Sequence, residues 1–355
     1  MPFWSGKSVL VTGGAGFIGS HLTPALLAAG ARVTVVDSLE RGTKEALRAV
    51  WGEISFDKAD LRDQQVAIRV CAGKDVVFHL ASKVGGIRYY TQRPFEVIEA
   101  NLQMDGNMLG AVLACAVPFY FYASSAHVYP IDLQRDAEAP PIREDQVLPA
   151  HPELSYGWAK LIGEKRIEYA LAEGKPLRAS VARIIGAYGP NQDFDLATGS
   201  AIPVFIRRAI EYPRLAPFRV LGTGNETRSY CFVRDIVAGI MTSTERLADQ
   251  SCIGPFNLGA EGRISIGELA RTIIEISNKE ITMEFDSSHP TLIWGQALDC
   301  SLASHLLDGW RPVVGLREGL QLCYRDIERR LSAQAFCAGN RSNRGAVHIP
   351  VERRP

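Results

Sequence analysis

Apolar residues in the first half of the chain follow two patterns that alternate. Short runs of consecutive apolar residues, such as 9–11 and 33–36, are typical of strands buried in a parallel sheet. Between these runs, apolar residues recur every three or four positions, as they do on one face of a helix. The predicted strands are 9–11, 33–36, 53–56, 75–82, 118–123 and 179–184, and the predicted helices are 17–29, 64–71, 94–113 and 156–171.

Strands that alternate with helices predict an α/β fold, a Rossmann-type doubly wound parallel sheet whose ligands bind at the carboxyl ends of the strands. We assign residues 1–185 to this Rossmann-type domain. After residue 186, glycine, proline and charged residues become frequent, with helices predicted at 202–210 and 266–277. We expect residues 186–331 to form mainly a smaller C-terminal substrate-binding α/β lobe, with crossings back to the sheet near 228–242. Residues 332–355 lack periodicity and are expected to be a disordered tail.

Three glycines follow the first predicted strand. Gly13, Gly16 and Gly19 stand at GxxGxxG spacing, and a helix is predicted to begin directly after Gly16. Glycines let the backbone approach a pyrophosphate closely, and a helix N-terminus directs free N–H groups and a partial positive charge toward it. Glycine triplets also occur in ordinary turns, but the order strand, turn, helix favours a pyrophosphate site.

A carboxylate ends the second predicted strand. Asp37 lies about twenty residues after the glycines, where a carboxylate can accept hydrogen bonds from the adenosine ribose hydroxyls and would repel a 2′-phosphate. This position indicates NAD rather than NADP as the cofactor. The alternative is an aspartate that only caps the next turn.

Tyr156 and Lys160 place a phenol and an ammonium four residues apart, and therefore on one face of the predicted helix 156–171. The Lys160 ammonium and the positive ring of NAD⁺ would lower the pKa of the Tyr156 phenol, so that it can act as a general base. The strand before this helix ends in Ser124 and Ser125, whose hydroxyls would lie at the same edge of the sheet. The alternative is a half-buried tyrosine beside a solvated lysine.

Composition and charge exclude several classes of protein. The chain has 355 residues, 46% of them hydrophobic, and a formal net charge of zero, so we expect a sizeable core and no nucleic-acid partner. Seven cysteines without a CxxC pair argue against a disulfide framework and against a metal site. No apolar run is long enough to cross a membrane, and we see no cleavable signal, so we expect a cytoplasmic protein without a membrane partner.

The segments TGGAGFIG, HLAS, ASSAHVYP, YGWAK and TRSYCFVRDI occur in this order in the chain. Together with Asp37 they resemble the extended short-chain dehydrogenase/reductase superfamily, and within it the NAD-dependent nucleotide-sugar epimerases and dehydratases. The match covers roughly residues 7–330. KVGGI at 83–87 and SSAHVYP at 124–130 most resemble GDP-mannose 3,5-epimerase and GDP-fucose synthase.

The resemblance implies the residues of the site. Tyr156, Lys160, Ser125 and His127 would carry the chemistry, and Gly85, Gly86, Ser125 and Arg228 would bind a nucleotide-diphosphate sugar, with a GDP type favoured. It also implies a homodimer formed through helices 95–113 and 156–171. The residues expected to bind NAD are Gly13, Gly16, Phe17, Ile18, Gly19, Asp37, Asp60, Leu61, Leu80, Ala81, Ser82, Asn101, Ala123, Tyr156 and Lys160.

The family mechanism removes the proton of the C4 hydroxyl with Tyr156 while the C4 hydride leaves to NAD⁺, which gives a transient 4-keto sugar. Return of the hydride to the opposite face inverts C4, and this reaction is our leading hypothesis because it needs only Tyr156, Ser125, Lys160 and NAD. Inversion at C3 or C5 with help from His127 is the alternative. A net ketosugar oxidoreductase and a catalytically silent nucleotide-binding protein are further hypotheses.

Departures from the family pattern bear on the choice. His127 stands where the 3,5-epimerases and fucose synthases have a cysteine, and Ser200 and Ala201 stand where they have a lysine or histidine. His127 is therefore either a lone acid–base group or a wall residue of the pocket. Ala126 and His127 also lack the carboxylates usual in the 4,6-dehydratases, and Gly186 replaces an asparagine that contacts the substrate in many relatives. His79, inside an apolar strand, is interpreted as a hydrogen-bonded core histidine.

Overall fold

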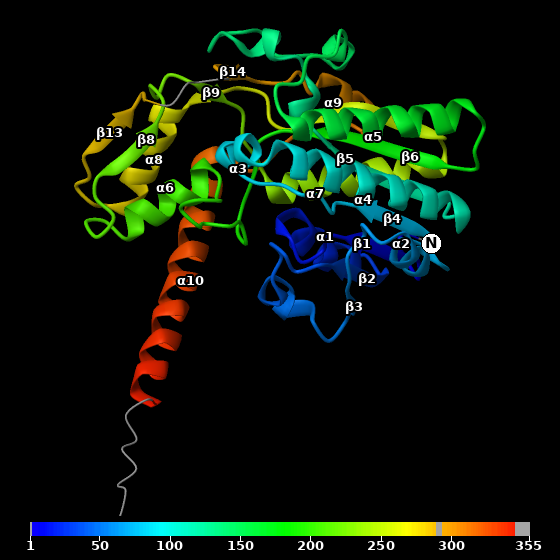
Figure 1. Ribbon diagram of the computed structural model, residues 1–355, viewed down its shortest axis with the longest axis horizontal. Helices are drawn as coiled ribbons and strands as arrows, with labels where there is room; N and C mark the ends of the chain where they lie inside the picture. Colours follow the sequence, from blue (N-terminus) through cyan, green and yellow to red (C-terminus); the bar gives the residue numbers. More distant parts are fainter. Residues whose placement is uncertain (1, 289–292, 345–355) are drawn as a thin grey trace, which may run out of the picture.

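A seven-stranded parallel sheet forms the centre of the molecule (Figure 1). The computed structural model describes residues 2–288 and 293–344. The strand order is β11-β6-β5-β4-β1-β2-β3, and every neighbouring pair is parallel. The strands are β1 (Ser8–Thr12), β2 (Arg32–Asp37), β3 (Ser55–Lys58), β4 (Val76–His79), β5 (Phe119–Ser125), β6 (Arg178–Ile184) and β11 (Cys252–Leu258).

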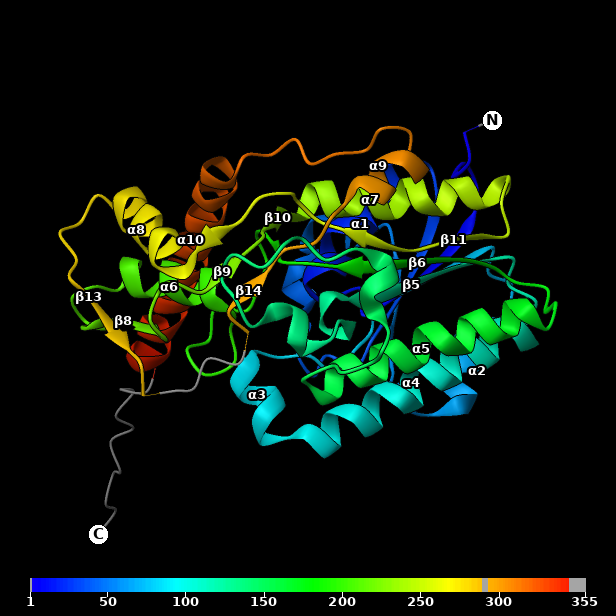
Figure 2. The ribbon, with the colours of Figure 1, turned by 90° about the horizontal axis from the view of Figure 1, so that it is seen from above.

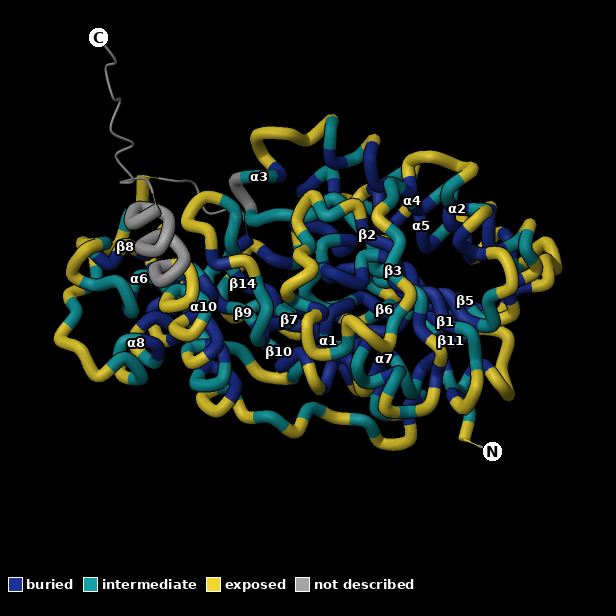
Figure 3. Tube along the Cα trace, turned by 90° about the horizontal axis from the view of Figure 1, so that it is seen from below, coloured by how far each residue is buried: buried dark blue, intermediate teal, exposed yellow. Residues whose placement is uncertain are grey.

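Helices cover both faces of this sheet. Helices α1 (Phe17–Ala28) and α7 (Val233–Glu245) lie on one face, and α2 (Gln64–Cys71), α4 (Pro94–Ala114) and α5 (Ser155–Ala172) lie on the other (Figure 2). Alternate residues of β1 supply the two cores, because successive side chains of a strand point to opposite faces. Val9 and Val11 pack with the α1 and α7 side, and Leu10 packs with the α2 and α4 side. Figure 3 shows the central strands as buried.

The predicted doubly wound sheet is confirmed, and the differences lie at strand ends. The fourth strand was expected over 75–82, but β4 ends at His79, because the following residues leave the sheet to line a cavity. The strand expected over 53–56 is shifted to Ser55–Lys58. The helix predictions for 64–71 and 266–277 coincide with α2 and with α8 (Ile266–Ser277).

The second half of the chain builds a smaller group of elements beside the carboxyl ends of the main strands. Three small sheets stand there, with α6 (Ala201–Ile210), α8, and α9 (Ser301–Leu306) between or against them. Because α7 and β11 return to the main sheet as late as Leu258, a boundary at residue 185 remains a prediction. The strands of the small sheets are β7 (Ala187–Tyr188), β8 (Phe218–Leu221), β9 (Thr227–Arg228), β10 (Cys231–Phe232), β12 (Ile264–Ser265), β13 (Met283–Asp286) and β14 (Gly295–Gln296). Of the shorter helices, α3 (Ile87–Gln92) precedes α4, and the 3₁₀ segments are Lys44–Val50, Ala126–Val128, Ile131–Gln134, Glu144–Val147 and Arg246–Ala248.

The last described helix, α10 (Leu316–Arg344), differs from the prediction for the C-terminal segment. Disorder was expected from residue 332, but the helix continues to Arg344 and projects away from the rest of the molecule (Figure 1). Leu320, Cys323 and Ile327 anchor its first half in the core. Beyond them the sequence has no apolar period, so its pattern does not predict a helix. Residues 345–355 lie outside the described part of the chain.

Among the described residues, no helix combines the length and the apolar character needed to cross a membrane.

Two helical glycines allow a matched test of the glycine turn. A Cβ at Gly19 would lie 2.4 Å from the Gly13 carbonyl oxygen and 2.5 Å from the Gly14 Cα, whereas a Cβ at Gly110 of α4 would meet nothing within 4 Å. We expect Gly19→Ala to lower the free energy of unfolding by about 2 kcal/mol or more, because backbone atoms must move. Gly110→Ala should raise it by about 0.5–1 kcal/mol through helix propensity. Urea unfolding measures both, and equal effects of the two substitutions would contradict the close packing of the turn.

Candidate active site

A cavity of about 530 Å³ opens at the carboxyl ends of the central strands. Its walls come from the glycine turn after β1, the end of β2, the loop after β4, the end of β5 and the start of α5. This is where ligands bind in doubly wound sheets, because the loops that follow parallel strands meet at one edge. Most of the residues predicted to bind NAD line it: Gly13, Gly16, Phe17, Ile18, Gly19, Asp37, Asp60, Leu61, Leu80, Ala81, Ser82, Ala123 and Tyr156.

The glycine turn leaves room that side chains would fill. Gly13 has a φ of +66°, and a Cβ there would lie 2.8 Å from the Ala81 backbone. Gly16 is the N-cap of α1 and makes no side-chain capping bond, so the start of the helix faces the cavity with free N–H groups. A bare helix N-terminus beside glycine backbone fits a pyrophosphate, and the turn would hold that part of a dinucleotide.

Asp37 ends β2 at the cavity wall and is buried. One carboxylate oxygen accepts a hydrogen bond from the Ala15 N–H at 3.0 Å, and the other accepts one from the Leu39 N–H at 2.8 Å. Burial raises the pKa of this carboxyl above its usual value. The structure thus contains the turn cap that was the alternative interpretation, and a carboxylate oxygen with a second lone pair can still accept a ribose hydroxyl.

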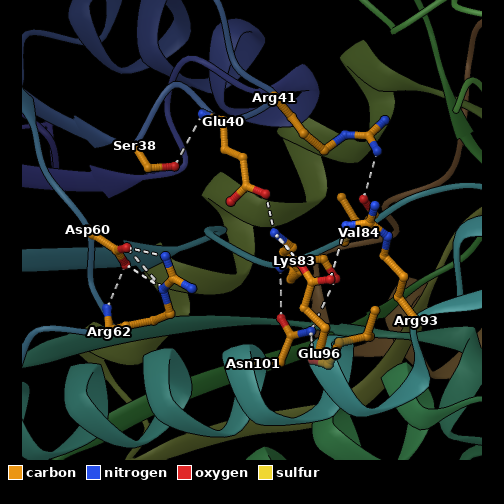
Figure 4. Close-up of polar contacts among 11 residues, drawn as sticks. Ser38, Glu40, Arg41, Asp60, Arg62, Lys83, Val84, Arg93, Glu96 and Asn101 are labelled. Atoms are coloured by element: carbon orange, nitrogen blue, oxygen red, sulfur yellow. Dashed lines mark hydrogen bonds and ion pairs between the residues drawn. The ribbon is translucent and has the colours of Figure 1, made fainter.

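Ion pairs lie at the part of the cavity that is formed by the loops after β3 and β4 (Figure 4). Asp60 pairs with Arg62 at 2.5 Å, and this hydrogen bond lowers the pKa of the Asp60 carboxyl. Lys83 pairs with both Glu40 and Glu96. Five charged side chains thus gather around the loop that follows β4. A polar ligand bound there would take the place of the water that contacts these side chains.

Asn101 was predicted to contact NAD, but the structure gives it another position. Its side chain is fully buried in α4 and is not among the residues that line the cavity. Its Oδ1 accepts hydrogen bonds from the Lys83 N–H at 2.9 Å (Figure 4) and from the Ser82 hydroxyl at 2.6 Å. Asn101 therefore fixes the loop after β4 from behind.

Of the predicted catalytic residues, Ser125, His127 and Tyr156 line the cavity, whereas Lys160, which was also predicted to bind NAD, lies behind Tyr156 and does not line it. The hydroxyls of Ser82 and Ser125 face the Tyr156 phenol, and the Lys160 Nζ lies 5.9 Å from the Tyr156 ring centroid. The side chains of Tyr156, Lys160, Ser82 and Ser125 are all partly or fully buried. Burial raises the pKa of Tyr156 well above 10, although both serine hydroxyls act in the opposite direction. The phenol therefore starts protonated, and it needs additional positive charge nearby to act as a base.

Aromatic side chains form the wall next to Tyr156. The Tyr90 ring, from α3, stacks on Tyr156 with centroids 5.2 Å apart, and the His127 ring meets Tyr156 edge-on at 5.9 Å. Burial lowers the pKa of His127 to about 4, and the nearby Arg228 acts in the same direction. His127 is therefore neutral near pH 7, where it can accept a proton but cannot donate one from an imidazolium.

The predicted substrate residues divide into two groups. Gly85 and Gly86 line the cavity, as does Ser125. Arg228, in β9, does not line it, and its guanidinium donates hydrogen bonds to the carbonyl oxygens of Thr227 and Ile293, both at 2.8 Å.

Three further positions at which this chain departs from the family pattern lie at the cavity or next to it. Gly186 has a φ of +53°, and a Cβ there would lie 1.9 Å from the Ser229 carbonyl oxygen, so an asparagine does not fit this backbone. Ser200 lines the cavity, whereas Ala201 begins α6.

The C-terminal helix also reaches the cavity. Asp326 of α10 accepts a hydrogen bond from the Asn191 N–H at 3.0 Å, and Arg330 donates one to the Gln192 carbonyl at 2.8 Å. Asn191, Gln192 and Arg330 all line the cavity.

Sequence reasoning missed several residues. Asp105 is a buried carboxylate on the apolar side of α4, four residues after Asn101, and its position on that side was the available signal. Just before Tyr156, Glu153 Oε2 and Ser155 Oγ are buried and have no hydrogen-bond partner among the described residues. His79 is fully buried and hydrogen bonded on both ring nitrogens, in agreement with its interpretation as a core histidine.

Comparisons with known proteins agree with this geometry. Residues 9–259 match the profile of the NAD dependent epimerase/dehydratase family. The chain is 32% identical to UDP-glucuronic acid decarboxylase 2 of Arabidopsis thaliana, over 92% of this chain and 69% of that protein. It is 27% identical to GDP-mannose 3,5-epimerase 1 of Oryza sativa subsp. japonica, over 94% of this chain and 85% of that protein. The structure of Thermus thermophilus UDP-glucose 4-epimerase in complex with NAD superposes with a TM-score of 0.75 at 25% identity, covering 90% of this chain and 98% of that one.

The resemblance predicted from the motifs is confirmed. The cavity at the carboxyl ends of the strands, with its glycine turn and its buried tyrosine backed by a lysine, belongs to an enzyme of the NAD-dependent epimerase/dehydratase family, and NAD is its cofactor.

Proposed function

We propose that the enzyme is a nucleotide-sugar epimerase that inverts C4 through a transient 4-keto sugar. The observation that carries the proposal is the meeting of the Tyr156 phenol with the Ser125 and Ser82 hydroxyls at the inner end of the cavity, above a buried Lys160. These groups suffice to move a proton at a single sugar hydroxyl, and C4 inversion through a ketone needs no other acid or base.

The roles of the residues follow from their positions. Tyr156 accepts the proton of the C4 hydroxyl and later returns it, and the Ser125 hydroxyl orients the same oxygen. When bound, NAD⁺ supplies the hydride acceptor for C4 and a positive ring that favours the Tyr156 phenolate. Lys160 adds a second positive charge on the buried side of the phenol. Tyr90 covers the Tyr156 ring and keeps water from it.

The substrate we propose is a nucleoside diphosphate sugar. The motifs at 83–87 and 124–130 favour a GDP sugar, and one relative is a GDP-mannose epimerase. The names of other relatives concern UDP sugars, so the assay needs both nucleotides.

Decarboxylation of a 4-keto uronic acid is a second candidate. The likeness to UDP-glucuronic acid decarboxylase supports it, and a carboxylate β to a new ketone leaves as carbon dioxide without a further catalytic base. Inversion at C3 or C5 has weaker support, because His127 is a lone neutral imidazole and Ala201 offers no acid–base group. A net ketosugar oxidoreductase would use the same residues but would consume NADH.

The first test is a panel of GDP and UDP sugars incubated with the enzyme in D₂O, with products identified by NMR and mass spectrometry. C4 epimerisation gives a new sugar without deuterium on carbon, inversion at C3 or C5 introduces deuterium there, and decarboxylation gives a pentose. We expect Tyr156→Phe to lower kcat by about 10²–10⁴-fold. Tyr169→Phe, an exposed position on the same helix, is the control and should leave kcat unchanged. Turnover only with added NADH would exclude the epimerase.

His127 gives a separate prediction. If C4 is the carbon inverted, His127→Asn should change kcat less than about tenfold, because the reaction needs no third proton-transfer group. A loss above about 100-fold together with deuterium at C3 or C5 would instead assign His127 as a base.

The same residue affects stability in acid. Above pH 6.5 His127 is neutral in the folded and unfolded states and has no effect. Between pH 6.5 and about 4 only the unfolded chain binds the proton, so the free energy of unfolding falls. We expect wild type to lose about 2 kcal/mol more than His127→Asn over this range, measured by urea unfolding. Parallel curves for the two proteins would contradict a histidine that stays neutral in the folded state.

A homodimer through α4 and α5 is the remaining proposal. Trp158, Ile162 and Tyr169 form an exposed apolar stripe on α5, and Phe95 of α4 is 77% exposed. We expect wild type to sediment as a dimer and the double substitution Trp158→Glu/Ile162→Glu to sediment as a monomer, because two charges would be buried at the contact. Leu221→Glu, an exposed site on β8, is the control. A monomeric wild type would refute the interface.

A further inference from the structure

A row of polar side chains crosses the apolar interior behind the cavity. Thr12, His79 and Tyr122 are register partners on the neighbouring strands β1, β4 and β5. Asp105 reaches this row from α4 and Lys160 reaches it from α5. We call these five residues the Asp105 cluster. Each of them is at most 4% exposed, so every charge in the cluster must be balanced inside the protein.

The hydrogen bonds of the cluster converge on the Asp105 carboxylate. The Thr12 hydroxyl accepts the Ala81 N–H at 3.1 Å and lies 2.9 Å from His79 Nδ1, so its own proton is available to that nitrogen. His79 Nε2–H then donates to Asp105 Oδ1 at 3.0 Å. The Tyr122 hydroxyl donates to Asp105 Oδ2 at 2.5 Å. Lys160 Nζ lies 3.6 Å from Asp105 Oδ1.

The charge states follow from these contacts. Burial raises the pKa of Asp105, but Lys160, His79 and Tyr122 outweigh burial and lower it below its usual value, so the carboxyl is ionised. Burial lowers the pKa of Lys160, and Asp105 acts against that effect. His79 is kept neutral by its burial. The cluster thus contains one negative and one positive charge.

Other titratable groups face the same region. Tyr120 and Tyr122 of β5 are buried phenols with strongly raised pKa values, and neither supplies charge near neutral pH. Glu164, one turn after Lys160, forms an ion pair with Arg183 at 2.7 Å and is committed to that contact. Among the described residues around Lys160, Asp105 is therefore the carboxylate without a guanidinium partner of its own.

We propose that Asp105 is a positioning residue for the reaction proposed above: its carboxylate is the buried counter-charge that holds the Lys160 ammonium behind Tyr156 and sets the pH range in which the pair works. Asp105 does not touch the cavity and acts through Lys160. The register of β1, β4 and β5 fixes its partners, so the ammonium has one position relative to the glycine turn and to the phenol.

The sign of the effect follows from the loss of one negative charge while Lys160 keeps its proton. Removing a negative charge favours the phenolate of Tyr156 and disfavours the ammonium of Lys160. Both pKa values therefore fall, because every proton near the site is held less strongly. A residue that only supports packing would instead lower the rate at all pH values and leave both limbs of the pH profile in place.

The main experiment compares wild type with Asp105→Asn, whose amide can keep hydrogen bonds to His79 and Tyr122. In the pH profile of kcat, both the rising and the falling limb should move to lower pH by about one unit or more. Asp105→Glu keeps the charge and should leave both limbs within about 0.3 unit of wild type, even if kcat falls. Glu99→Gln removes one charge from the exposed side of the same helix and should leave the profile unchanged.

A second readout does not require turnover. The NAD-bound protein is labelled with ¹³C at the tyrosine ζ carbon, and the Tyr156 signal is identified by its loss in Tyr156→Phe. Its titration midpoint should be lower in Asp105→Asn than in wild type where Lys160 keeps its proton, and higher where the loss of Asp105 also neutralises Lys160. Equal curves overturn the proposal, including the case in which neither protein titrates below pH 11. If no sugar nucleotide is converted, the proposed function fails while this titration still decides the role of Asp105.

If Asp105→Asn does not fold, Tyr122→Phe takes its place. This substitution keeps the carboxylate and removes one of its donors, so the charge acts more strongly on Lys160 and Tyr156. The Tyr156 midpoint should then rise, and an unchanged or lower midpoint overturns the proposal.

Discussion

The register between β1, β4 and β5 is the constraint on which the rest of the site depends. It aligns Thr12, His79 and Tyr122 in one row, and it places Gly13 directly against the backbone of Ala81. A shift of one residue would turn each of these side chains to the other face of the sheet. The apolar alternation of β1, with Val9 and Val11 on one face and Leu10 on the other, opposes such a shift by burying both faces. Packing of the core thereby sets the geometry of the cavity.

Much of this molecule could be predicted from local patterns. The parallel strands, the helices between them, the glycine turn and the pair Tyr156 and Lys160 each depend on residues close together in sequence. The features that could not be predicted join distant segments. The partners of Asp105 come from β4, β5 and α5, and Arg228 donates a hydrogen bond to the Ile293 carbonyl, 65 residues later. The last half of α10 escaped prediction because its sequence has no apolar period.

Membership of the family fixes the fold and the cofactor but not the sugar carbon that reacts, because members share one scaffold and differ in a few side chains. In this chain those side chains are a neutral His127, a stacked Tyr90 and a glycine at 186 that the backbone requires. The site is thus poor in groups that could donate a proton to carbon. The lack of such proton donors favours a reaction in which the sugar is oxidised and reduced at one carbon.

The contacts of α10 at the cavity have a consequence for how the protein is made. The glycine turn lies within the first twenty residues, whereas Asp326 and Arg330, which hold the loop at Asn191 and Gln192, come near the end. The sheet can collapse as it emerges from the ribosome, but the wall of the cofactor site is complete only after residue 330 has been translated. A nascent chain of this enzyme therefore completes its main sheet at Leu258 and completes the wall of its nucleotide site only later, when Arg330 has been added.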